Sequence, residues 1–137
     1  AERRMLFSTT GTEERRLEPI LSGPELMSIQ RLVRQIPVPD KVVEAILQLV
    51  RTARPGTGAD AETDKFVAWG PGPRASQALM LAVRAKALVD GRLAPSVDDV
   101  LALAEPVLKH RMALNFAARA EGRQIGAVIG RLAASIA

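Results

Sequence analysis

Arg74 is the side chain whose position most favours chemistry, because it stands directly behind two Gly-Pro pairs, Gly70-Pro71 and Gly72-Pro73. The pairs predict a rigid turn, in which Gly72 is the N-cap of a helix and Pro73 takes its first position. A helix N-terminus carries roughly +0.5 charge, which disfavours an arginine in the first turn. Free backbone N–H groups beside a guanidinium suit a phosphate. Alternatively Arg74 simply extends into solvent, and the spacing alone leaves both interpretations open.

Other kinds of reactive site are excluded by residue type. The sequence has no cysteine, which rules out disulfides, cysteine-ligated zinc and a thiol nucleophile, and its single histidine, His110, excludes a histidine metal cluster. A Walker P-loop needs a Gly-Lys-Ser/Thr run to hold phosphates and place magnesium, and no lysine here follows a glycine. We therefore expect that the chain alone is not a self-contained enzyme and that it holds no metal.

Composition indicates a helical domain with an aliphatic core. The chain has 137 residues, of which 47% are hydrophobic but only 3% aromatic, a balance that favours closely packed helices over a β-sandwich. No apolar run is long enough to cross a bilayer, so we expect no membrane association and a cytoplasmic location. The net charge of +4 is spread along the chain rather than gathered, so we do not expect nucleic acid as a partner.

Hydrophobic periodicity predicts an all-α bundle of about four main helices with a short helix at either end. The pattern Ser96-Val97-Asp98-Asp99 predicts a capping box, and Pro106 is expected to kink or split the helix that follows it. We expect Phe66, Val67 and Trp69 to anchor a loop onto the bundle, and a minor two-stranded pairing between 92–95 and 113–116. The main helices are predicted at 22–36, 40–53, 73–90 and 96–111, and the terminal ones at 1–7 and 123–136.

The order of several motifs resembles the C-terminal lid of MoxR-family AAA+ ATPases. The carriers are the run from Trp69 through Arg74 to Leu79, the run from Arg84 to Arg92, Val97-Asp-Asp-Val100, and Pro106-Val-Leu-Lys-His-Arg111, with Leu17-Glu-Pro-Ile-Leu upstream. The resemblance covers nearly the whole chain. It implies that 1–7 is the end of a helix that leads from an ATPase core, which is missing here, and that 8–137 is the helical lid.

The resemblance also implies a role for the Gly-Pro-Arg turn. In this family the arginine of the motif is the sensor 2 residue, which maps to Arg74 and reaches the γ-phosphate of ATP held by the core. Gly72 and Pro73 would then lie at the nucleotide. ATP and Mg would bind in the full-length bacterial parent, a ring hexamer that couples ATP hydrolysis to chaperone-like maturation of client proteins. We expect none of these ligands to bind the lid alone, because a single arginine offers too few contacts.

Three further interpretations stay open at this stage. His110 and Arg111 recur in the family, and they either contact an adjacent subunit or offset the dipole at a helix C-terminus. The chain could instead be a standalone helical adaptor whose last helix docks on a partner through Ile125, Val128 and Leu132. The high pI also leaves a basic nucleic-acid-binding module as an alternative.

Overall fold

The computed structural model describes residues 1–12 and 18–136. It divides into two parts, Ala1–Gln30 and Arg31–Ala137, and each is described by itself. Leu17, which belongs to one motif of the family resemblance, lies outside the described residues. The predicted boundary between a linking helix at 1–7 and a lid at 8–137 stays a prediction.

The first part contains helix α1 (Glu2–Thr10) and the beginning of α2 (Gly23–Gln35). Helix α1 runs three residues further than the sequence predicts. The hydroxyls of Ser8 and Thr9 donate to the carbonyl of Met5, and the hydroxyl of Thr10 donates to that of Leu6, so these polar side chains bond within the helix. Helix α2 lies within the predicted range 22–36 and is one residue shorter at each end.

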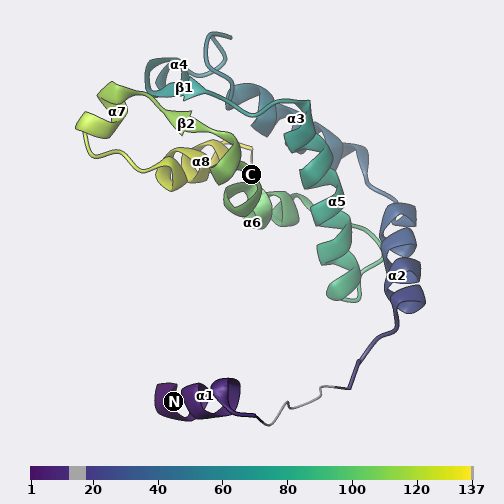
Figure 1. Ribbon diagram of the computed structural model, residues 1–137. Coiled ribbons are helices and arrows are strands. Elements are labelled where there is room, and N and C mark those ends of the chain that lie inside the picture. Colours follow the sequence, from purple (N-terminus) through teal and green to yellow (C-terminus); the bar gives the residue numbers. More distant parts are fainter. Residues whose placement is uncertain (13–17, 137) are drawn as a thin grey trace. The chain divides into compact units, whose positions relative to one another are not determined.

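The second part is a helical bundle built around α3 (Asp40–Thr52), α5 (Pro73–Val89), α6 (Val97–Leu108) and α8 (Ile125–Ala134). Helix α6 packs against α5, α8 and α3, and α3 also runs beside α5 (Figure 1). Their large, fully buried side chains are aliphatic, as the composition predicts: Val42, Ile46, Leu49, Val50, Leu79, Val83, Val100, Leu108, Ile129 and Leu132. The all-α prediction is confirmed.

Short elements join the main helices and include some that the sequence did not reveal. Helix α4 (Ala61–Phe66), strand β1 (Val67–Trp69), the 3-10 turn η1 (Lys109–Arg111), strand β2 (Ala113–Leu114) and helix α7 (Phe116–Ala120) occupy predicted loops or helix ends. Strands β1 and β2 pair antiparallel, with Val67 opposite Leu114 and Trp69 opposite Ala113. A two-stranded pairing was expected, but its predicted partner strand at 92–95 was wrong.

The start of helix α6 is set by a capping box, and a proline lies near its end. Its capping box is present as predicted: the backbone N–H of Ser96 donates to the Asp99 carboxylate at 2.8 Å. Pro106 lies inside the helix without splitting it, which corrects one of the two predicted outcomes. The helix continues two residues beyond the proline and tightens into η1 only at Lys109.

The last helix belongs to the core of the second part. Val128 and Leu132 are buried, with 4% and 1% of their surface exposed, and they pack with residues of α3 and α6. Two of the three side chains that the adaptor interpretation assigned to a partner are therefore covered by the chain itself. That version of the adaptor hypothesis is wrong.

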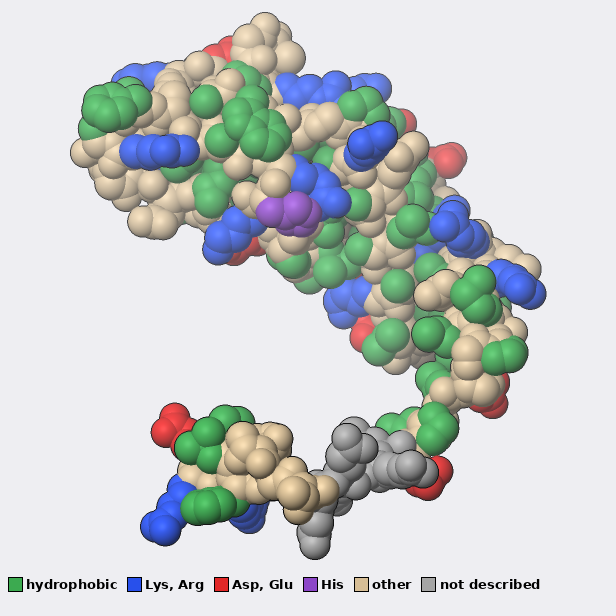
Figure 2. All heavy atoms as spheres, in the orientation of Figure 1, with side chains coloured by type: hydrophobic (Ala, Val, Ile, Leu, Met, Phe, Trp, Pro, Cys, Tyr) green, Lys and Arg blue, Asp and Glu red, His purple; other side chains and the backbone are tan. Residues whose placement is uncertain are grey.

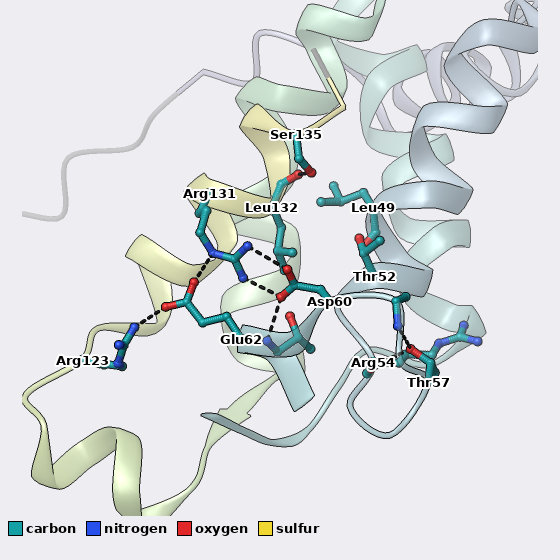
Figure 3. A network of polar contacts seen from close by, with 12 residues as sticks. Leu49, Thr52, Arg54, Thr57, Asp60, Glu62, Arg123, Arg131, Leu132 and Ser135 are labelled. Atoms are coloured by element: carbon teal, nitrogen blue, oxygen red, sulfur yellow. Dashed lines mark hydrogen bonds and ion pairs between the residues drawn. The ribbon is translucent and has the colours of Figure 1, made fainter. Parts of the chain in front are cut away.

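An ion-pair network ties α8 to the loop before α4. Figure 3 shows the Arg131 guanidinium between the carboxylates of Asp60 and Glu62, and Arg123 on the other oxygen of Glu62. Asp60 is also the N-cap of α4, where it accepts from the Thr63 backbone N–H at 2.7 Å. One carboxylate thus satisfies a helix start and an arginine 71 positions away.

Candidate functional site

The turn before α5 is fixed against the end of α3. Gly70 lies so close to it that an added Cβ would stand 2.4 Å from the carbonyl oxygen of Ala53. The Pro71 side chain is fully buried, and its carbonyl accepts a hydrogen bond of 2.9 Å from Nε of Arg54. Gly70 is therefore required for close approach of two backbone segments. Nothing in the sequence around Arg54 indicated this contact.

Helix α5 starts as the sequence predicts. Gly72 is the N-cap with extended backbone, Pro73 is the first helical residue, and the Gly72 carbonyl accepts from the Ala75 N–H at 2.9 Å. A Cβ built on Gly72 would meet no atom within 4 Å, so open space surrounds this residue. Arg74 is exposed while Ala75 is buried. The turn thus holds the backbone firmly and leaves the guanidinium accessible.

Arg74 lines a pocket of about 550 Å³ that also brings His110 and Arg111 to the same place. The sequence predicted sites at Arg74, Gly72 and Pro73 and a separate interface at the His-Arg pair, but it did not predict that these groups share one cavity. The cavity lies between the start of α5, β1 and η1. Its described lining residues are Trp69, Gly72, Pro73, Arg74, Ala75, His110 and Arg111.

Trp69 forms part of the pocket wall instead of anchoring a loop. Phe66 and Val67 are buried as predicted, whereas Trp69 is 55% exposed, which corrects the expectation for the tryptophan. The strand pairing explains its position: Trp69 lies opposite Ala113, two residues after Arg111. Because this pairing joins segments distant in sequence, spacing alone could not have placed Trp69 beside Arg111.

Arg111 is held by two contacts at the end of α6. Its Nη1 donates to the carbonyl of Val107 at 2.6 Å and also to Nε2 of His110. A cation that bonds a carbonyl in the last turn of a helix stabilises that end, as the dipole interpretation predicts. The alternative prediction, that His110 and Arg111 contact an adjacent subunit, stays a prediction.

The chemistry of the lining suits an anion. Two guanidinium groups and one imidazole face the pocket, and none of the lining residues within the described chain is acidic. A phosphate group fits such a donor set. Mg²⁺ prefers oxygen ligands, which these side chains do not supply, so a magnesium ion would need carboxylates or phosphates from elsewhere. In residues 1–12 and 18–136, no group of three His, Cys, Asp or Glu side chains is arranged to hold a metal.

Basic side chains lie around this site on the face of the second part that Figure 2 shows. The single histidine, purple in Figure 2, lies among Lys and Arg side chains. Elsewhere on the visible face of the second part, Lys and Arg side chains stand apart over several elements. Among the helices that the structure describes, none combines the length and apolar character that a membrane crossing requires.

An all-α bundle that presents an exposed arginine from a Gly-Pro turn is the arrangement expected of an AAA+ lid. The chain belongs to the AAA lid domain family, which matches residues 59–131. It is similar to Chaperone MoxR1 of Mycobacterium tuberculosis, with 29% identity over 137 residues that cover 99% of this chain and 36% of that protein. The resemblance to MoxR-family AAA+ lids is therefore confirmed.

Two further proteins are similar to this chain, one in sequence and one in fold. The Uncharacterized protein YeaC of Bacillus subtilis is 32% identical over 120 residues, which cover 88% of this chain and 35% of YeaC. The crystal structure of a "putative ATPase" from Cytophaga hutchinsonii has the same fold, with a TM-score of 0.83 and 21% identity over 96% of this chain and 40% of that one. The chain thus spans about a third of the length of the curated relatives it matches.

Proposed function

We propose that this chain is the nucleotide-sensing lid of a MoxR-like AAA+ ATPase, with Arg74 as its sensor 2 residue. In this proposal an ATPase core of the longer protein holds ATP and Mg²⁺, and the lid closes over the nucleotide so that Arg74 reaches the γ-phosphate. Gly72 and Pro73 would approach the phosphate chain with their backbone. The core is the lid's first partner.

The observation that carries the proposal is the accessible guanidinium of Arg74 on a rigid support. The buried Pro71, the close approach at Gly70 and the Arg54 hydrogen bond fix the turn, while Arg74 itself remains exposed beside a cavity without lining acids. A charge fixed before the reaction stabilises negative charge that develops on a transferred phosphoryl group. It also couples the presence of that phosphate to the position of α5.

We further propose that the parent assembles as a homo-oligomeric ring and drives chaperone-like maturation of client proteins. The support is the likeness to a relative named Chaperone MoxR1. A lid reports nucleotide state and does not itself select a client, so the client would be recognised by other parts of the ring. Localisation in the cytoplasm is part of the same proposal.

ATP turnover by the longer protein, wild type beside Arg74→Ala, tests the role of Arg74. Loss of a preorganised charge should lower the turnover number by a factor on the order of 10²–10³, with a smaller effect on nucleotide binding. Arg74→Lys keeps a charge but loses the planar fork and should recover only part of the rate. Arg119→Ala, an exposed arginine of α7, is the surface control. Unchanged turnover in Arg74→Ala would reduce this arginine to a feature of a helix start.

The coding sequence offers an independent test. The reading frame that contains this chain should encode a Gly-x-x-x-x-Gly-Lys-Ser/Thr motif upstream, because the lid has no phosphate-binding loop of its own. A frame without that motif would contradict the proposed ATPase while leaving the lid fold unchanged.

A further inference from the structure

Arg111 stands in the same pocket as Arg74 but comes from a different element. Arg74 belongs to the first turn of α5, and Arg111 ends the η1 turn after α6. Both guanidinium groups therefore reach one cavity of about 550 Å³ from two separate supports. Such an arrangement can bind two neighbouring oxygens of an extended anion, which a single arginine cannot do as well.

Both arginines lack an acidic partner within the described part of the chain. The ion pairs of the described residues use other cations on Asp and Glu carboxylates, namely Lys86, Arg92, Lys109, Arg123 and Arg131. Arg74 and Arg111 take part in none of the described pairs. Two like charges that face one cavity without a carboxylate repel each other, so an anion between them would relieve that repulsion.

Arg111 is already oriented before any ligand arrives. It is only partly exposed, and its Nη1 is committed to the Val107 carbonyl at 2.6 Å and to His110. Because a guanidinium only donates, Nε2 of His110 is the acceptor in this contact. His110 thus acts through Arg111 and limits the directions in which the remaining guanidinium N–H groups can point.

We propose that Arg111 is a second cation for the phosphate chain of the nucleotide, with His110 as its positioning residue. This inference rests on the proposed function, because it assigns the ligand class of the same site. It extends that function by giving the lid a two-arginine polyphosphate site in place of a single sensor. It also revises the expectation that the lid alone offers too few contacts to bind.

Trp69 provides a direct readout, because it is the only tryptophan and its half-exposed indole lines this pocket. Inorganic tripolyphosphate is the probe, since it carries the phosphate chain without a base. We expect tripolyphosphate at constant ionic strength to change Trp69 fluorescence saturably in the wild-type chain. Arg111→Ala and Arg74→Ala should each weaken this binding by about tenfold or more, because each removes a charge-assisted hydrogen bond. Arg119→Ala should bind as wild type.

His110 is tested by rescue. His110→Ala removes the acceptor and should weaken tripolyphosphate binding, whereas His110→Gln offers a side-chain carbonyl to Arg111 and should recover most of it. Circular dichroism spectra that match wild type exclude unfolding as the cause. Equal binding by His110→Ala and wild type would overturn the positioning role.

The outcomes separate this inference from the proposed function. If Arg74→Ala weakens tripolyphosphate binding and Arg111→Ala does not, the second-cation role is wrong while the Arg74 site stands. Absence of any saturable fluorescence change in the wild-type chain would overturn the two-arginine site. The proposed ATPase lid would still be judged by turnover of the longer protein carrying Arg74→Ala. Arg111 as a subunit contact likewise predicts unchanged tripolyphosphate binding in Arg111→Ala.

Discussion

The Nε–H group of Arg54 donates a hydrogen bond to the carbonyl oxygen of Pro71, with 2.9 Å between nitrogen and oxygen. Arg54 follows the end of α3, and Pro71 lies three residues before Arg74. The bond therefore connects the frame of the bundle to the turn that carries the candidate site. Together with the burial of Pro71, this hydrogen bond explains how the exposed Arg74 side chain can stand on a fixed backbone.

Replacement of Arg54 by Ala should loosen this turn. The Pro71 carbonyl would lose its donor in a partly buried place, which we expect to cost about 1 kcal/mol in the free energy of unfolding. Urea denaturation of the chain measures the change. Arg51→Ala, an exposed arginine one turn earlier, should change stability much less. Equal effects of the two substitutions would show that the hydrogen bond to Pro71 contributes nothing specific.

Replacement by alanine should destabilise the chain at Gly70 but have little effect at Gly72. In Gly70→Ala the new Cβ would stand 2.4 Å from the Ala53 carbonyl oxygen and 2.8 Å from Cα of Arg54, both backbone atoms. The backbone must shift, at a cost of about 1–3 kcal/mol or more. Gly72→Ala enters open space and should remain within about 0.5 kcal/mol of wild type. Thermal unfolding of both variants decides the matter, and a Gly70→Ala protein as stable as wild type would refute the close approach.

Local signals were enough to predict the long helices and the Arg74 turn. Pro73 and Gly72 specify the start of α5 through backbone preferences alone, and the Ser96 box specifies the start of α6 in the same way. Hydrophobic periodicity then identifies the buried faces. These features depend on residues within one or two turns of one another, which is why the sequence alone contains them.

The short elements depend on distant partners and were missed for that reason. Asn115 caps α7 by accepting from the Ala118 N–H at 2.9 Å, and its Nδ2 donates to the Lys65 carbonyl, 50 positions away, at 2.7 Å. The grouping of Arg111 with Arg74 in one pocket likewise requires the packed bundle and the β1–β2 pairing. The sequence of one segment does not show which distant segment packs against it. His110 and Arg111 could therefore be singled out from the sequence, but their place in the same cavity as Arg74 could not.

Leu132→Asp distinguishes a core helix from a docking helix. Leu132 is 1% exposed, so the substitution buries an unpaired carboxylate and should cost more than about 4 kcal/mol, enough to unfold a marginally stable domain. Ala134→Asp lies on the exposed side of the same helix and should leave the chain folded. Far-UV circular dichroism and gel filtration report both outcomes. A folded Leu132→Asp chain that merely loses a partner would restore the adaptor hypothesis.

The ion pair between Asp60 and Arg131 should make the chain less stable as the pH falls below the usual pKa of aspartate. The Arg131 hydrogen bonds hold the pKa of the Asp60 carboxyl well below its usual range, and a capping hydrogen bond from Thr63 acts in the same direction. The unfolded carboxyl titrates at about 3.9, so the stability that Asp60 contributes is fully present above that pH and is lost as the pH falls toward the lower folded pKa.

Asp60→Asn isolates this effect, because asparagine also serves as an N-cap but carries no charge. We expect the variant to be less stable than wild type at pH 7 and pH 5, and the difference to shrink at pH 3. Urea denaturation at the three pH values gives the free energies. Glu44→Gln, an exposed carboxylate of α3 that forms no ion pair within the described residues, is the matched control. A difference as large at pH 3 as at pH 7 would contradict the charge effect, because the contribution of a carboxyl with a lowered folded pKa must fall once the unfolded carboxyl is protonated.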